Sequence, residues 1–144
     1  MKKNKAKISD LSRSLIEIAW HFGPKGLNGE CCEDISMPEF IALDKISNTR
    51  YCPVQEIGQR LGFTKSGATR IVNRLEKKGY VHKMTSSDDA RVCCVVITTS
   101  GEKVIKDADE RYLEKLNQLL MKMPENIRQK TEELFKSMAR ALRS

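Results

Sequence analysis

Apolar residues near the start of the chain recur at helical spacing. Each is three or four positions from the next, at Ile8, Leu11, Leu15, Ile18 and Phe22. This spacing places them on one stripe and predicts a helix of about 15 residues that ends before Gly23 and Pro24. A second helix is predicted to open at Ser36 and Pro38, with Glu39 at the capping-box position and four apolar residues pointing inward: Phe40, Ile41, Leu43 and Ile46.

Two short helices are predicted next. Pro53 suits the first position of one helix, which would place Cys52 at its N-cap, and Gly62 would end it. Thr64 is expected to cap the other helix, which Gly79 closes. Their apolar faces would consist of Val54, Ile57 and Leu61, and then of Ala68, Ile71, Val72 and Leu75. Two helices joined by a connection this tight predict a helix-turn-helix.

The pattern changes after these helices. Residues 80–85 and 91–98 are rich in β-branched side chains, and a polar turn lies between them at 86–90. This arrangement predicts a β-hairpin. A helix-turn-helix followed by a hairpin is a winged helix, so the expected fold class is α+β and mostly α.

Long amphipathic helices are expected to flank this winged helix. One begins at Thr99 or Ser100 and runs to about Met123, and another follows Pro124. The central part of the chain is too small to cover the apolar stripes of these helices and of the N-terminal helix, so we expect the stripes to pack on a second copy. The sequence therefore predicts one domain at 1–144, with dimerisation helices at 8–22 and 100–143 and a winged helix-turn-helix part at 36–98.

Length and composition restrict the class of protein. A chain of 144 residues, 40% apolar and 31% charged, suits a single globular domain with a modest core. Its longest apolar run, 92–97, is far shorter than the roughly 18 residues that a membrane span needs. The basic N-terminus leads into an amphipathic segment instead of an apolar signal core. We therefore expect a cytoplasmic protein whose cysteines are reduced.

Positive charge is concentrated in two segments. The net charge is +7, and residues 1–7 carry +4 while residues 64–79 carry another +4, so the rest of the chain carries −1. A localised basic segment indicates a polyanionic partner, nucleic acid first.

The predicted helix at 64–79 has a polar face suited to DNA. If its apolar residues are buried, hydroxyl, amide and guanidinium groups lie outside, and these groups donate to phosphates and to purine edges. The candidates for base readout are Lys65, Ser66, Thr69, Arg70 and Asn73. Those for phosphate binding lie further along the helix and are Arg74, Lys77 and Lys78. An ordinary solvated helix face is the alternative.

The tip of the hairpin carries a second candidate. Asp89 and Arg91 flank one residue, so their side chains emerge on the same side of an extended segment. The carboxylate would hold the guanidinium outward toward a minor groove, where negative potential favours arginine. The alternative is a surface ion pair worth less than about 1 kcal/mol.

Several motifs resemble one known family. They are R-L-E-K-K-G-Y-V at 74–81, D-x-R at 89–91 and I-T-x-x-G at 97–101. Together they resemble the multiple-antibiotic-resistance regulator (MarR) family over nearly the whole chain. The resemblance implies a homodimeric winged-helix repressor or activator of transcription on a pseudo-palindromic operator, often released by a small ligand or by thiol oxidation. It implies DNA contacts at Ser66, Thr69, Arg70 and Asn73, and a wing contact at Arg91.

The cysteines suggest a possible sensor. A thiol at a helix N-cap feels the positive end of the helix dipole, which would lower the pKa of Cys52 and raise its reactivity. The hypothesis is that Cys52, or Cys31 and Cys32 with His21 and Glu33, responds to an oxidant, an electrophile or a soft metal. The spacing matches no strong metal signature, so no metal site is predicted. Packing as small apolar residues is the alternative, and it is the expectation for Cys93 and Cys94.

Catalysis has no support in the sequence. His21 and His82 are isolated, and no nucleophile triad, paired carboxylates or glycine-rich phosphate loop is evident. We expect no enzyme activity and no cofactor. The predicted partners are double-stranded DNA, a second copy of the chain and a small-molecule effector. Two alternatives remain: a thiol- or metal-binding sensor, and a winged helix that binds a protein instead of DNA.

Overall fold

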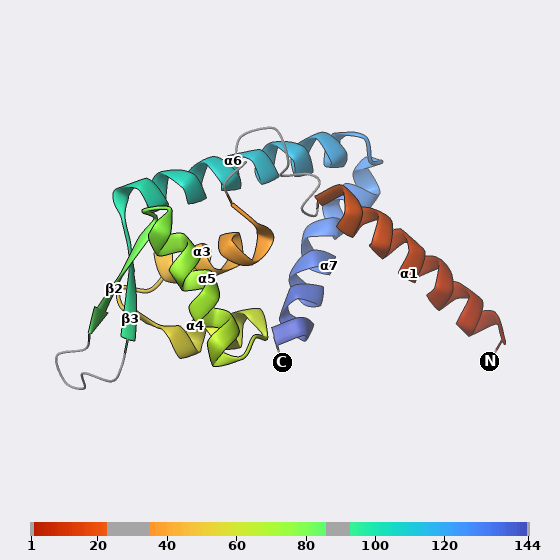
Figure 1. The fold of residues 1–144 in the computed structure, drawn as a ribbon. Helices are drawn as coiled ribbons and strands as arrows, with labels where there is room; N and C mark the ends of the chain where they lie inside the picture. The colour runs from red at the N-terminus through yellow and green to blue at the C-terminus, as the bar shows by residue number, and fades with distance from the viewer. Residues whose placement is uncertain (1, 23–34, 86–92, 144) are drawn as a thin grey trace. The chain divides into compact units, whose positions relative to one another are not determined.

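The computed structural model describes residues 2–22, 35–85 and 93–143 (Figure 1). The chain divides into two compact units, Met1–Asp109 and Glu110–Ser144. The elements of the first unit are α1 (Lys2–Phe22), α3 (Met37–Ser47), β1 (Cys52–Pro53), α4 (Val54–Leu61), α5 (Lys65–Lys77), β2 (Val81–Thr85), β3 (Cys93–Ile97) and the first part of α6 (Thr99–Met121). The second unit holds the rest of α6 and α7 (Glu125–Arg143).

Local signals position most of these helices as predicted. The Glu39 backbone N–H donates to Ser36 Oγ at 3.3 Å and the Ser36 N–H donates to Glu39 Oε2 at 3.1 Å, so the capping box of α3 is confirmed. Gly62 ends α4 with φ +68°, a left-handed conformation that favours glycine. Thr64 Oγ1 accepts the Gly67 N–H at 3.2 Å and caps α5. The first helix begins at Lys2, six residues earlier than its apolar stripe.

The sheet has three antiparallel strands in the order β1-β3-β2. The hairpin predicted after α5 is confirmed, and its register pairs Val81 with Ile97 and Lys83 with Val95. Strand β1 was not predicted. It places Cys52 opposite Val95 on the other side of β3.

The core of the first unit lies where α3, α4 and α5 pack on one another and on the sheet (Figure 1). The largest fully buried side chains are Leu43, Ile46, Ile57, Leu75, Val72, Val81, Val95 and Cys52. Full burial of an aliphatic side chain of this size stabilises a fold by about 1.5–3 kcal/mol. The apolar faces predicted for α4 and α5 therefore hold the winged helix together.

The start of α6 is joined closely to the end of the hairpin. Thr98 donates its backbone N–H to the Tyr80 carbonyl oxygen at 3.0 Å and its hydroxyl to the Gly79 carbonyl oxygen at 2.7 Å. The same hydroxyl accepts the Gly101 N–H at 3.1 Å. A Cβ at Gly101 would overlap the Tyr80 carbonyl oxygen and lie 2.8 Å from Ile97 Cγ1. The I-T-x-x-G motif thus marks the point where α6 meets the wing.

The remaining helices carry exposed apolar residues. On α1, Ile8, Leu11 and Leu15 are each more than half exposed, and on α7 the same holds for Leu134 and Leu142. Over the described ranges, no helix combines the length and the hydropathy needed to cross a membrane.

Candidate nucleic-acid interface

Helix α5 presents two chemically different faces. Ala68, Val72 and Leu75 are completely buried and Ile71 nearly so. The polar residues of this helix are exposed, except Thr69, which is half-buried. The exposed ones are Lys65, Ser66, Arg70, Asn73, Arg74, Glu76 and Lys77. The division of this helix into apolar and polar faces is confirmed, while the assignment of the polar face to DNA stays a prediction.

Hydroxyl groups on this face take part in local contacts. Thr69 Oγ1 donates to the Lys65 carbonyl oxygen at 2.8 Å, so its proton is already used and its lone pairs are left to accept. Ser66 Oγ lies 3.1 Å from Thr64 Oγ1 at the helix start. Arg70 is exposed near the middle of α5, between these hydroxyls and the C-terminal cations. The face therefore combines hydrogen-bond donors, acceptors and positive charge.

A contact between α5 and β2 involves one of the predicted readout residues. Lys83 Nζ lies 2.7 Å from Asn73 Oδ1 and 3.5 Å from Glu76 Oε1, and the Lys83 backbone N–H donates to Glu76 Oε2 at 3.0 Å. The wing strand is thereby joined to the polar face of the helix. Lys83 was not predicted from the sequence, because it lies on a different element from its partners Asn73 and Glu76.

Lys78 differs from the other cations near the end of α5. Its Nζ lies 2.7 Å from Glu39 Oε2, and the Glu39 side chain is only 3% exposed. Lys78 was expected to bind phosphate, but its ammonium is paired with a buried carboxylate of α3. Its structural role is to neutralise that charge and to join α3 to the end of α5.

The strands of the wing are described, but its tip is not. Asp89 and Arg91, the predicted orienting carboxylate and minor-groove arginine, lie outside the described residues. The antiparallel pairing of β2 with β3 includes every residue from Val81 to Thr85.

Known proteins match this winged helix. The model of the MarR family matches residues 35–93. The HTH-type transcriptional regulator YfiV of Bacillus subtilis (strain 168) is 29% identical over 109 residues, which cover 76% of this chain and 68% of that relative. Over its winged helix, the chain is therefore similar to the MarR family and to HTH-type transcriptional regulators. Two further HTH-type regulators, from Clostridioides difficile and Staphylococcus haemolyticus, align over only 42% and 46% of their own lengths.

Solved structures share the MarR fold along the whole chain. A MarR family protein from Bacillus stearothermophilus is 19% identical with a TM-score of 0.80, and the alignment covers 100% of this chain and 99% of that one. Streptococcus pneumoniae FabT, crystallised in complex with DNA, is 19% identical with a TM-score of 0.73, over 98% and 96% of the two chains. The winged-helix fold and the regulator class predicted from the sequence are confirmed, and the relatives are regulators instead of enzymes.

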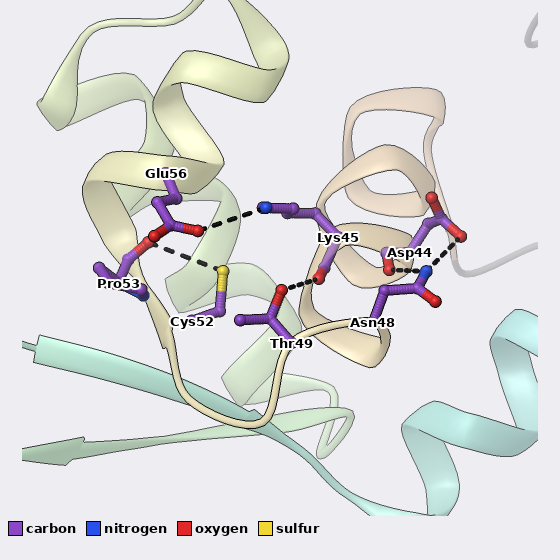
Figure 2. Close-up of polar contacts among 7 residues, drawn as sticks. All are labelled: Asp44, Lys45, Asn48, Thr49, Cys52, Pro53 and Glu56. Carbon is purple, nitrogen blue, oxygen red and sulfur yellow. Dashed lines mark hydrogen bonds and ion pairs between the residues drawn. The ribbon is translucent and has the colours of Figure 1, made fainter.

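The position of Cys52 differs from the prediction. Cys52 belongs to β1, and Pro53 is the N-cap of α4, without a side-chain capping bond. Pairing of β1 with β3 keeps both residues extended, so the helix begins one residue later than predicted. The Cys52 side chain is completely buried, and its Sγ lies 3.8 Å from the Pro53 carbonyl oxygen (Figure 2). The N-cap prediction was wrong.

The electrostatic surroundings of Cys52 oppose ionisation. Burial raises the pKa of the thiol above its ordinary value of 9.0, and the neighbouring Glu56 carboxylate raises it further, while Lys45 opposes that increase. Lys45 Nζ and Glu56 Oε2 form an ion pair of 3.3 Å on α3 and α4 beside the thiol (Figure 2). A lowered pKa was the reason for proposing Cys52 as a sensor, and the structure contradicts it.

Three other candidate sensor residues, Cys31, Cys32 and Glu33, lie outside the described residues. His21 is exposed at the end of α1. In the three described ranges, no cluster of three or more His, Cys, Asp or Glu side chains could hold a metal ion. Cys94 is half-buried on β3, opposite Pro53.

Proposed function

We propose that this chain is a cytoplasmic, homodimeric transcription regulator of the MarR family. It would bind a pseudo-palindromic operator and repress transcription until an effector releases it. The observation that carries the proposal is α5, a helix with one fully buried apolar face and an opposite polar, basic face. In a helix-turn-helix, such a helix lies in the major groove. The complex of the similarly folded FabT with DNA supports DNA as the partner.

The polar face of α5 suits both parts of DNA recognition. Ser66, Thr69, Arg70 and Asn73 offer donors and acceptors for base edges, with Lys65 beside them at the helix start. Arg74 and Lys77 follow toward the C-terminus and would bind phosphates. Base edges would then supply specificity, while the phosphate contacts would supply affinity that falls steeply with salt.

A dimer would use the flanking helices. The exposed apolar residues of α1 and α7 belong to the predicted dimerisation segments at 8–22 and 100–143. A two-fold dimer would place two copies of α5 in successive major grooves, about 34 Å apart along the duplex. An effector that changes the distance between the two recognition helices would release the operator.

The direct test of this proposal is a selection of genomic fragments by the purified, reduced protein, repeated with an oxidant and with zinc. The expected result is enrichment of one pseudo-palindromic site by the reduced protein. Loss of that site after oxidant or zinc would make the cysteines the sensor. An unchanged site would leave a small organic ligand as the effector.

A matched variant makes the selection decisive. Arg70→Ala should weaken the enrichment, whereas Arg140→Ala, which removes the same charge from an exposed position of α7, should leave it unchanged. If no fragment is enriched under any condition, the DNA-binding proposal fails. Binding of a protein partner with little dependence on salt would then be the better account.

A further inference from the structure

We propose that Lys83 is a positioning residue that determines sequence specificity. It would orient the Asn73 side chain so that Asn73 acts toward DNA as a hydrogen-bond donor. This inference rests on the proposed function of α5. The observation behind it is a hydrogen bond between the wing and the recognition helix. Lys83 lies on the wing strand β2, and its Nζ is 2.7 Å from Oδ1 of Asn73 on the polar face of α5.

The chemistry of lysine determines the orientation of the amide. A lysine ammonium has three donors and no acceptor, so the amide atom next to it has to be the oxygen. The Asn73 oxygen therefore faces Lys83, and the Nδ2 group lies on the other branch of the amide. Because Asn73 is exposed on the face predicted to meet DNA, both Nδ2 donors can reach a base, whereas Oδ1 already accepts one hydrogen bond from Lys83.

Glu76 holds Lys83 in place for this task. Asn73 and Glu76 are three residues apart on α5 and so share a face of the helix. Glu76 accepts the Lys83 backbone N–H at 3.0 Å through Oε2, and its Oε1 lies 3.5 Å from the Lys83 ammonium. The lysine is thus held at both its backbone and its tip, and its charge is balanced within the protein instead of being directed to a phosphate.

This arrangement changes which bases Asn73 is suited to contact. A free asparagine reads adenine with both amide atoms, accepting from N6 and donating to N7. An asparagine whose oxygen is held by lysine is best suited to donate, and its targets are base-edge acceptors such as guanine N7 and O6 or thymine O4. Lys83 would therefore select against the two-bond contact with adenine at one position of each half-site.

The test is a set of operator duplexes in which every base pair is replaced in turn, bound by wild type, Lys83→Met, Asn73→Ala and the double variant. At the one base pair whose preference Asn73→Ala removes, Lys83→Met should shift the preference toward adenine by about fivefold or more. The double variant should behave as Asn73→Ala, because Lys83 acts through Asn73. Lys83→Arg, which also lacks an acceptor, should retain the wild-type preference.

Controls separate this role from a general loss of charge. Lys103→Met removes one positive charge from an exposed position of α6 and should leave every preference unchanged. If Lys83→Met weakens all duplexes alike and lowers the salt slope by about one, Lys83 is a phosphate contact and the inference is wrong. If the wild-type preference persists in Lys83→Met, the inference is also wrong.

A measurement without DNA tests the contact itself. In the free protein, the side-chain amide resonances of Asn73 should shift in Lys83→Met and stay unchanged in Lys103→Met. Unshifted resonances in Lys83→Met would overturn the inference even if the regulator binds its operator. If the wild type shows no sequence preference, the proposed function fails, and the inference about DNA fails with it.

Discussion

At the scale of single residues, the Glu39 carboxylate is a buried charge with two hydrogen-bond donors beside it. Its side chain is 3% exposed, yet Oε2 accepts from the Ser36 backbone N–H and from the Lys78 ammonium. Burial of an unpaired carboxylate would be costly, and these two donors offset that cost. The pair joins the start of α3 to the end of α5, so it also restrains the helix that we propose binds DNA.

Lys78→Met should therefore destabilise the fold. The variant leaves the buried Glu39 carboxylate without its counter-ion. Because Lys78 is about one-third exposed, we expect the free energy of unfolding to fall by about 1–3 kcal/mol, which is less than the full cost of breaking a buried pair. Urea unfolding followed by circular dichroism measures the loss. Lys77→Met, at the exposed neighbouring position, should change stability by no more than about 0.5 kcal/mol.

The double variant Lys78→Met/Glu39→Gln should recover part of that stability, because it removes the uncompensated charge and keeps an acceptor for Ser36. Equal stabilities of Lys78→Met and wild type would contradict this account of the pair.

Cys52 should behave as a buried structural thiol. Its raised pKa means that little thiolate exists at neutral pH, so alkylation by iodoacetamide at pH 7 should be slower at Cys52 than at the half-buried Cys94. Peptide mass spectrometry after timed labelling measures both rates. Preferential labelling of Cys52 at pH 7 would restore it as a sensor candidate.

The same shift gives stability a pH dependence. The thiol has a higher pKa in the folded protein than in the unfolded chain, where its ordinary value is 9.0. Its contribution to stability is complete below pH 9 and is lost as the pH rises from that value toward the folded pKa. Urea unfolding at pH 8 to 10 should therefore reveal a decline that is smaller in Cys52→Ala.

At the scale of elements, the features that depend on neighbouring residues in the chain were predictable from the sequence. Ser36, Gly62 and Thr64 act within one helical turn, and their roles were predictable from spacing. The apolar faces of α4 and α5 follow directly from helical periodicity.

Contacts between distant segments were not predictable in this way. Strand β1 exists because two residues pair with β3 about 40 positions later, and this pairing removes Cys52 from the N-cap. The polar face of α5 was predicted residue by residue, but its links to Lys83 and Glu39 depend on tertiary packing. No local pattern reveals which exposed lysine is paired and which is available to DNA.

Gly101→Ala should weaken the junction between the wing and α6. A Cβ there would overlap the Tyr80 carbonyl oxygen, which is backbone and already accepts the Thr98 N–H. We expect a loss of about 2 kcal/mol, typical of forcing a methyl group into a packed site. Thermal unfolding measures it, and Ser100→Ala, at the exposed preceding position, is the matched control. A melting temperature equal to that of wild type would show that the junction yields without cost.

At the scale of the whole molecule, the proposed dimer explains the apolar residues that the single chain leaves exposed. Leu11 and Leu15 are 66% and 53% exposed on α1. Placing charge on this stripe should disfavour burial against a second copy, so Leu11→Glu/Leu15→Glu should shift the protein from dimer to monomer. Light scattering coupled to gel filtration measures the mass. Arg13→Glu, on the opposite side of α1, should remain dimeric, and a monomeric wild type would contradict the dimer.

The central claim is that the exposed face of α5 reads DNA sequence, and one measurement tests it most directly. It is the ratio of affinities for the selected operator and for a scrambled duplex, compared among wild type, Arg70→Ala and Arg140→Ala at a fixed salt concentration. The account predicts a ratio of about a thousand or more for wild type and Arg140→Ala. Arg70→Ala should lower that ratio by about fivefold or more, because the loss of a base contact affects the operator alone. A ratio near one for wild type, or an unchanged ratio in Arg70→Ala, would contradict the claim.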